Sequence, residues 1–324
     1  MRAAVIGAGF IGDFHAVMYA EHPQAELCAV CDVDEKRAED MAQRYGARAY
    51  TGAQEMLAAE KPELVSVCLP TYMHREYVLM ALDAGAHVLC EKPFALTMED
   101  CRAMDEAAQK AGRVLMVGQM LRWWPEYVRI AQEVRALGRP HYVQARRLQH
   151  PMRVIWHMQP HQGGGALFDL LVHDVDYVCS LLGTDCEVVA ANGSRGPQGS
   201  WRRIDAMLRW KDGCHARVEA CNMMPEGYPF TAAFHAEYPE ACVDYSFRAP
   251  INIQRGAPTK TELIVYKDGQ VFAPELTPDA QSAAFREEID AFIRGVQAGV
   301  SPLPAKESIG VMQVIHGIKA LLER

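Results

Sequence analysis

Three glycines directly follow the first apolar run of the chain, and their spacing constrains the fold more than any other feature. Residues 3–6 lead into Gly7, Gly9 and Gly12. A GxGxxG motif between a strand and a helix is typical of dinucleotide-binding units, in which the helix N-terminus binds the pyrophosphate. Asp32 follows Gly12 by 20 residues, at the position where a carboxylate binds the ribose hydroxyls. The expected cofactor-binding residues of this region are Gly7, Gly9, Phe10, Ile11, Gly12 and Asp32.

The first third of the chain alternates short β-rich runs with helical stretches. The strand runs are residues 3–6, 26–31, 64–69, 87–90 and 114–117, and two of the helices between them span 72–84 and 97–110. Strands separated by helices form parallel βαβ units. We therefore predict that residues 1–120 form an NAD-binding Rossmann domain, a doubly wound parallel α/β sheet.

The pattern changes beyond residue 140, where longer alternating runs are joined by hairpin signals. The runs are residues 141–148, 187–192, 204–210, 215–222, 231–237 and 263–267, with Asp-Gly at 212–213 and 268–269. Asp-Gly between two strand runs is typical of a tight β-hairpin. We predict a mainly antiparallel α+β substrate-binding domain over 121–324, ending in helices near 279–298 and 305–322, the last of which could pack back on the first domain.

The composition favours a small-molecule ligand. The 324 residues are 50% apolar and 23% charged, the formal net charge is −8, and no dense Lys/Arg block is present. Nucleic acid and membrane partners are therefore not expected. The ten cysteines contain no CxxC pair, so we interpret them as small buried residues of a cytoplasmic protein rather than a disulfide or zinc framework.

Two further segments contain candidate catalytic residues. Glu91, Lys92 and Pro93 follow a strand of the parallel sheet, and open α/β sheets bind ligands at the carboxyl ends of their strands. Residues 163–165 are three consecutive glycines before a helix that contains Asp169 and His173, four residues apart on one helical face. The apolar residues around this pair predict a buried helix. Taken alone, the pair is more simply interpreted as a structural hydrogen bond.

The ordered motifs resemble the glucose-fructose oxidoreductase, inositol dehydrogenase and rhizopine-catabolism (Gfo/Idh/MocA) family. The resemblance rests on residues 7–12, Asp32, the turn at 69–74, residues 91–93 and residues 163–176. It implies that Lys92, Asp169 and His173 are catalytic. It also implies an open-faced sheet in the second domain, through which a homodimer or homotetramer could form. Further expected cofactor-binding residues are Pro70, Thr71, His74, Glu91 and Lys92.

Asp32 favours NAD over NADP, because a carboxylate repels a 2′-phosphate. The neighbouring Lys36 and Arg37 are the counter-argument, although a solvated helix face is the simpler interpretation. Candidate substrate-binding residues in the second domain are Arg122, Trp123, Arg153, Trp156 and His157. His157 and His161 are four residues apart like metal ligands, but Pro160 between them disfavours a regular helix, so no metal is expected.

The expected reaction is hydride transfer between a nicotinamide and a hydroxyl-bearing carbon of a sugar, a cyclitol or a sugar derivative. His173 would accept the hydroxyl proton and Lys92 would hydrogen-bond the reacting oxygen. A glycosidase that oxidises its sugar transiently with bound NAD would use the same residues, and a non-catalytic dinucleotide-binding regulator is a third interpretation. Net NADH formation from candidate polyhydroxyl substrates separates these alternatives.

Overall fold

The computed structural model describes residues 1–151, 154–250 and 259–324, which divide into two compact units. The first unit comprises residues 1–120 and 284–309, and the second comprises 121–283 and 310–324. Arg153, one of the candidate substrate residues, lies outside the described residues. No helix in the described ranges combines the length and apolar character needed to span a bilayer.

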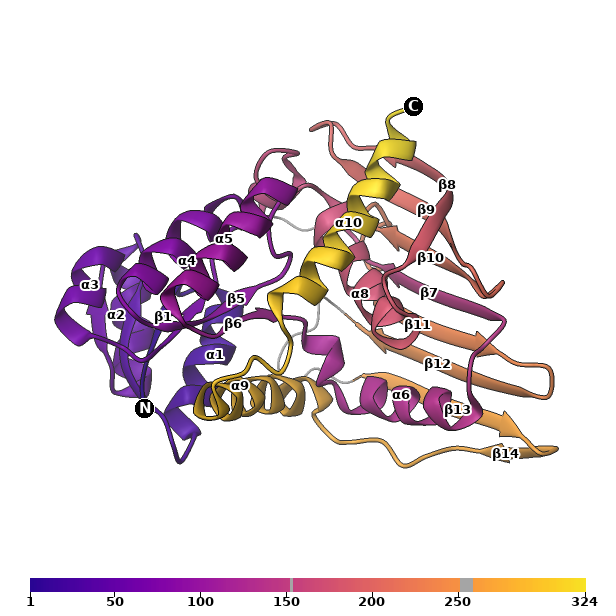
Figure 1. Ribbon diagram of the computed structural model, residues 1–324, viewed down its shortest axis with the longest axis horizontal. Coiled ribbons are helices and arrows are strands. Elements are labelled where there is room, and N and C mark those ends of the chain that lie inside the picture. Colours follow the sequence, from indigo (N-terminus) through magenta and orange to yellow (C-terminus); the bar gives the residue numbers. More distant parts are fainter. Residues whose placement is uncertain (152–153, 251–258) are drawn as a thin grey trace. The chain divides into compact units, whose positions relative to one another are not determined.

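The first unit is built on a parallel sheet of six strands in the order β3-β2-β1-β4-β5-β6. Figure 1 labels three of these strands, β1, β5 and β6, and the helices around them. The strands are β1 (Arg2–Ile6), β2 (Glu26–Cys31), β3 (Arg48–Tyr50), β4 (Leu64–Val67), β5 (His87–Glu91) and β6 (Leu115–Gly118). The helices are α1 (Phe10–Glu21), α2 (Glu35–Tyr45), α3 (Ala53–Glu60), α4 (His74–Asp83) and α5 (Met98–Ala111). The central strands are buried along almost their whole length, as expected when helices cover both faces of a parallel sheet. The predicted doubly wound sheet is confirmed.

Helix α9 (Ala280–Ala298) returns to this first unit for most of its length. Its Phe285 ring stacks on Phe14 of α1 with 4.5 Å between centroids, and Asp290 lies 3.2 Å from the His22 imidazole. Most of the last helix, α10 (Ala305–Leu322), belongs instead to the second unit. The penultimate helix thus belongs to the first unit for most of its length, where Phe285 contacts Phe14 of α1.

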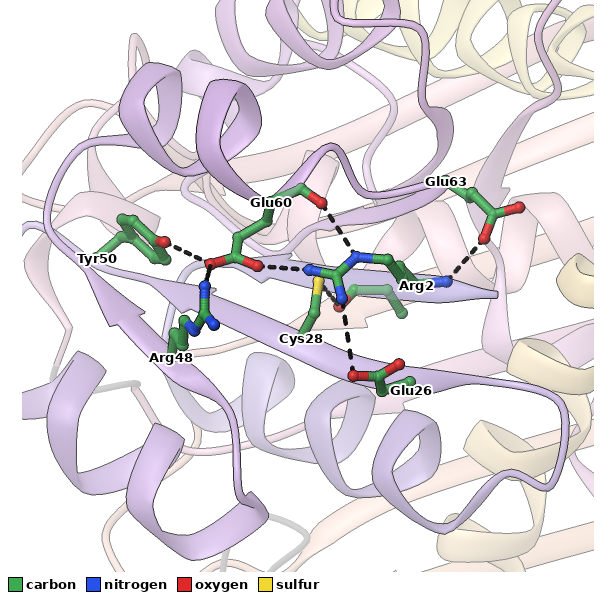
Figure 2. A network of polar contacts seen from close by, with 8 residues as sticks. Arg2, Glu26, Cys28, Arg48, Tyr50, Glu60 and Glu63 are labelled. Atoms are coloured by element: carbon green, nitrogen blue, oxygen red, sulfur yellow. Dashed lines mark hydrogen bonds and ion pairs between the residues drawn. The ribbon is translucent and has the colours of Figure 1, made fainter.

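A buried carboxylate stabilises the first unit away from the glycine motif. Glu60 accepts hydrogen bonds from Arg2 and from the Tyr50 hydroxyl, both at 2.5 Å, and from Arg48 at 2.9 Å (Figure 2). The Tyr50 hydrogen bond and the positive charge of Arg48 hold the pKa of Glu60 below its ordinary value, although burial opposes them. Two guanidinium groups thus compensate the burial of one carboxylate.

The second unit is built on an eight-stranded sheet in the order β14-β13-β12-β11-β7-β10-β9-β8. Its strands are β7 (Tyr142–Leu148), β8 (Cys186–Arg195), β9 (Trp201–Trp210), β10 (His215–Cys221), β11 (Phe230–Glu237), β12 (Ala241–Ala249), β13 (Lys260–Lys267) and β14 (Gln270–Phe272). Every pairing is antiparallel except that of β7 with β10. The predicted mainly antiparallel sheet is confirmed, although β12 and β14 were not among the predicted strands.

Helices of the second unit pack on this sheet, as Figure 1 shows for α6 and α8. They are α6 (Pro125–Leu137), α7 (Ala166–Asp169) and α8 (Leu171–Leu182). Alternate residues of the central strands point toward these helices and are buried, as in β9 and β12. Both Asp-Gly pairs form the predicted hairpins, between β9 and β10 and between β13 and β14.

Candidate active site

The glycine loop between β1 and α1 is closed so tightly that two of its glycines have no room for a side chain. Gly7 donates a hydrogen bond to the Cys31 carbonyl at 2.7 Å and has a φ of +105°. A Cβ on Gly7 would lie 2.3 Å from the Cys68 carbonyl oxygen, and one on Gly12 would lie 1.8 Å from the Gly7 carbonyl oxygen. Because Gly7 and Gly12 have no side chain, the loop can pass over the strand ends and α1 can approach β1.

Gly9 faces open space instead. A Cβ there would meet no described atom within 4 Å, and no side chain caps the first turn of α1. The turn therefore presents uncapped backbone N–H groups beside free space, which is what an anionic pyrophosphate requires. The neighbouring Phe10 is 56% exposed, and Ile11 is half-buried.

Asp32 is fixed in place at the carboxyl end of β2. One carboxylate oxygen accepts a hydrogen bond from the Ala8 amide at 2.8 Å, and the other accepts one from the Asp34 amide at 2.9 Å. The structure thus brings Asp32 to the glycine loop. Arg37 lies 3.3 Å from the Asp34 carboxylate and is engaged on the surface of α2. The loop and Asp32 fit a dinucleotide.

The turn after β4 contains Pro70, Thr71 and His74. Pro70 is half-buried and Thr71 is buried. The His74 ring is completely buried, with Nε2 2.9 Å from the Leu69 carbonyl and Nδ1 3.3 Å from the Phe94 carbonyl. Burial lowers the pKa of His74, and the hydrogen bonds to the Leu69 and Phe94 carbonyls oppose this effect. In this structure His74 connects two loops of the first unit.

Lys92 follows β5 directly and is half-exposed. Its backbone N–H donates to the Glu91 side chain at 3.1 Å, and the other Glu91 oxygen lies 3.0 Å from Nε2 of His15. His15 lies on α1, and its Nδ1 is 2.9 Å from the Ser66 hydroxyl. Sequence reasoning did not single out His15, although a histidine within an otherwise apolar helical stretch was the available signal.

A third acidic side chain completes this cluster. Glu288 of α9 is fully buried. One of its carboxylate oxygens, one carboxylate oxygen of Glu91 and one ring nitrogen of His15 all lie within 4.8 Å of one another. Over the described ranges, no other group of His, Cys, Asp and Glu side chains gathers three donor atoms so closely.

In the second unit, the three consecutive glycines allow the segment 155–163 to lie against α7. A Cβ on Gly163 would lie 2.6 Å from the His157 Cα, and one on Gly165 would lie 2.6 Å from the Trp201 carbonyl oxygen. Gly164 has a φ of +72°, and a Cβ there would lie 2.4 Å from the Phe168 ring. The Gly165 amide donates to the His157 carbonyl at 2.9 Å. The glycines thus determine how closely His157 approaches the helix.

Asp169 and His173 lie on two short helices instead of the single one expected. The break is at Leu170, where α7 ends and α8 begins, but the backbone there stays in the right-handed helical region. The His173 amide bonds to the carbonyl of Leu170, three residues back. Both side chains are buried, with 6% and 9% of their residue surfaces exposed. The predicted buried helical environment is present.

His157 and Trp156 lie beside this pair. The Nδ1 atom of His157 is 3.6 Å from a carboxylate oxygen of Asp169, and the Trp156 and His157 rings stack with centroids 3.6 Å apart. Two residues that the sequence suggested only for substrate contact are therefore part of the environment of Asp169.

Arg122 makes a bidentate pair within the second unit. Its guanidinium donates to both carboxylate oxygens of Asp176 at 2.9 and 2.8 Å. The neighbouring Trp123 is half-buried. The pairing of Arg122 supplies a structural role for this candidate substrate residue.

Two protein-family models match this chain. Residues 1–119 match the oxidoreductase family with an NAD-binding Rossmann fold, and residues 127–238 match the C-terminal domain of the GFO/IDH/MocA family.

Individual relatives and solved structures agree with this result. The chain is 39% identical over 190 residues to D-glucoside 3-dehydrogenase of Escherichia coli strain K12, which covers 56% of this chain and 54% of that enzyme. It is 29% identical over 301 residues to UDP-N-acetylglucosamine 3-dehydrogenase of Acidithiobacillus ferrooxidans, covering 92% of this chain and 89% of that enzyme. The fold is similar to that of KijD10, a 3-ketoreductase from Actinomadura kijaniata in complex with NADP and TDP-benzene, with a TM-score of 0.87, 21% identity and coverage of 99% and 98%. The chain belongs to the GFO/IDH/MocA family of oxidoreductases.

Proposed function

We propose that this enzyme transfers a hydride between NAD and a hydroxyl-bearing carbon of a sugar, cyclitol or sugar derivative. The observation that carries the proposal is the pair of buried titratable side chains, Asp169 and His173, in the second unit of a chain whose first unit has a dinucleotide-binding loop. Burying an acid and an imidazole is unfavourable unless they have partners, and such pairs are concentrated at functional sites.

NAD is the proposed cofactor because of Asp32. Its carboxylate is held by two backbone amides and retains lone pairs for the two ribose hydroxyls. A 2′-phosphate at this place would meet the charges of both Asp32 and Asp34. Of the two basic residues that could compensate that charge, Lys36 and Arg37, Arg37 lies against Asp34.

The protein's own residues manage the proton and the charge at the reacting oxygen. Bound nicotinamide supplies the hydride acceptor. His173 takes the proton of the substrate hydroxyl, since an imidazole titrates near neutral pH. Lys92 donates a hydrogen bond to the same oxygen and stabilises the negative charge that develops there. Asp169, which has His157 beside it, orients Lys92 or a neighbouring hydroxyl.

The names of the relatives suggest which carbon reacts. The two dehydrogenases described above act at position 3 of a glucoside and of UDP-N-acetylglucosamine, and the structural neighbour is a 3-ketoreductase. We propose oxidation of a ring secondary hydroxyl, with position 3 of a glucoside as the first substrate to examine.

The test is formation of reduced cofactor from a panel of methyl glucosides, free aldoses and inositols, with NAD and NADP in parallel. We expect NADH from at least one compound, a 3-keto product from a reactive glucoside, and much slower use of NADP. Release of the aglycone without net NADH would replace this proposal by the redox-assisted glycosidase. No reduction of either cofactor by any compound would contradict it.

Location and assembly are further parts of the proposal. All ten cysteines are free thiols and most are buried, which suits a reducing cytoplasm. We propose a homodimer or homotetramer formed through the eight-stranded sheet of the second unit. Light scattering coupled to size exclusion tests it, and a monomer at micromolar concentration would contradict it.

A further inference from the structure

Glu288 is a buried carboxyl group whose environment differs from that of the other buried glutamate described above. Its residue surface is completely inaccessible, and neither carboxylate oxygen has a hydrogen-bond partner among the described residues. Glu60, in the same unit, is surrounded by two guanidinium groups and a phenol. Glu288 instead faces a second carboxyl group, that of Glu91, together with the His15 imidazole, and one polar atom of each of the three side chains lies within 4.8 Å of the others.

The groups that face Glu288 come from three elements of the first unit. They are His15 and Tyr19 from α1, Cys68 after β4, and Glu91 at the end of β5. Burial raises the pKa of Glu288 well above its ordinary value, and the charge of Glu91 raises it further. Burial raises the pKa values of Tyr19 and of the Cys68 thiol, and the nearby Glu288 carboxylate adds a smaller effect in the same direction. A neutral carboxyl beside a charged Glu91 is the state that these surroundings favour.

Glu91 is also the link to Lys92. One of its oxygens accepts the Lys92 backbone N–H at 3.1 Å and the other contacts His15 Nε2 at 3.0 Å. The Glu91 carboxylate therefore bridges the His15 ring and the backbone N–H of Lys92. A second negative charge within 4.8 Å would repel that carboxylate, and burial leaves little water to screen the repulsion.

We propose that Glu288 is a positioning residue for Lys92. As a neutral carboxyl group, Glu288 leaves Glu91 in contact with the Lys92 backbone N–H. When Glu288 ionises, it displaces the Glu91 side chain and, with it, the segment that starts at Lys92. The inference rests on the proposed catalytic role of Lys92. It assigns a role in the reaction to a residue of α9, almost 200 positions further along the chain.

The first experiment needs no turnover. The cofactor-free protein is pulse-labelled with acetic anhydride between pH 5 and 10, and acetylation of Lys92 is quantified by peptide mass spectrometry. In the wild type we expect the labelling rate to show an inflection in addition to the titration of the amine itself. Glu288→Gln, which is neutral at every pH, should lose that inflection, and Glu60→Gln should retain it. Identical profiles for wild type and Glu288→Gln would overturn the proposal.

The second experiment measures turnover with NAD and the reactive compound of the glucoside and inositol panel. We expect the kcat of the wild type to fall at alkaline pH as Glu288 ionises, and Glu288→Gln to lose that part of the fall, with the KM for NAD unchanged in both proteins. The same pH profile of kcat in both proteins would overturn the proposal.

Two controls distinguish a failure of this inference from a failure of the proposed function. If Lys92→Met is fully active, the proposed function fails, whereas the labelling result still reports on Glu288. If Lys92→Met is inactive and Glu288→Gln behaves as wild type, only the inference fails. Elemental analysis that finds one divalent cation per chain, absent from Glu288→Gln, would also overturn it, because a cation and not a proton would then compensate the two carboxylates.

Discussion

The imidazole of His157 faces the carboxylate of Asp169, with 3.6 Å between Nδ1 and the nearer oxygen. The contact joins the segment before the three glycines to the helix after them. It provides Asp169 with a partner inside its own unit, which the sequence did not indicate. A protonated His157 would hold Asp169 in its charged form, and the stacked Trp156 ring restricts how far His157 can turn.

Replacing His157 by Phe should keep the aromatic stacking on Trp156 and remove the contact with Asp169. We expect kcat to fall by about tenfold, because the Asp169 carboxylate loses the group that orients it. Steady-state kinetics and the melting temperature are the measurements. Trp156→Phe is the matched control, since it keeps His157. A kcat equal to that of wild type in His157→Phe would mean that the contact has no part in the reaction.

Lys92→Met and His173→Ala should each reduce turnover by about a hundredfold or more, because each removes a group that we propose acts on the reacting oxygen. NAD binding, measured by calorimetry, should survive in both variants. Near-normal rates in both would show that the chemistry lies elsewhere.

Asp32→Ser should weaken NAD binding and improve the use of NADP. The variant loses the carboxylate that we propose binds the ribose hydroxyls and repels a 2′-phosphate. We expect the ratio of kcat/KM for NAD to that for NADP to fall by about a hundredfold, corresponding to about 2.7 kcal/mol. A ratio that does not change would assign cofactor choice to other residues.

Gly164→Ala should destabilise the second unit by about 2–5 kcal/mol, because a positive φ and an overlap with Phe168 add together. Gly213→Ala is the matched control. Gly213 also has a positive φ, of +92°, but a Cβ there meets no described atom within 4 Å, so we expect a cost of about 1–2 kcal/mol. Denaturant unfolding of both variants compares the two costs. Equal costs would mean that the Phe168 contact adjusts freely.

Glu288→Gln and Glu60→Gln should change stability in opposite directions. The pKa of Glu288 in the folded protein lies well above the ordinary 4.5, so above pH 4.5 the folded state holds a proton that the unfolded chain has released. The free energy of unfolding of the wild type therefore falls as pH rises from 4.5 toward that raised pKa. Glutamine has no proton to lose, and Glu288→Gln should gain stability relative to wild type over this range.

The pKa of Glu60 is lowered from 4.5, so its stabilising contribution is complete above pH 4.5 and is lost as pH falls through the lowered value. Glu60→Gln should accordingly be less stable than wild type at neutral pH and approach it in acid. Urea unfolding at a series of pH values tests both variants. A Glu288→Gln difference that shrinks with rising pH would contradict the assignment of a neutral carboxyl.

The regular features of this fold could be predicted because they depend on local patterns. Thr97 caps α5 by accepting from the Asp100 amide, and Gly112 ends the helix in the left-handed region, as their residue types predict. The strand β3 is only three residues long, too short for an alternating pattern to be recognised. The break at Leu170 could not be predicted, because the residues on both sides of it favour a helix.

The candidate site was only partly predictable for a different reason. The glycine motif and Asp32 are tied to fixed positions along the chain, so spacing alone identified them. The neighbours of Glu91 and Asp169 depend on tertiary packing. Glu91 meets His15 and Glu288, and Asp169 meets His157, through contacts between separate elements. No local pattern encodes such contacts.

The return of α9 to the first unit has a consequence for biosynthesis. The ribosome releases residues 1–120 long before residues 284–309, which complete the same compact unit. Until then, Phe14 lacks the Phe285 ring that stacks on it, and the nascent nucleotide-binding half exposes apolar surface to chaperones. A fragment that stops at residue 120 should therefore aggregate, whereas grafting α9 onto it through a short linker should yield a monomeric, independently folding mini-domain.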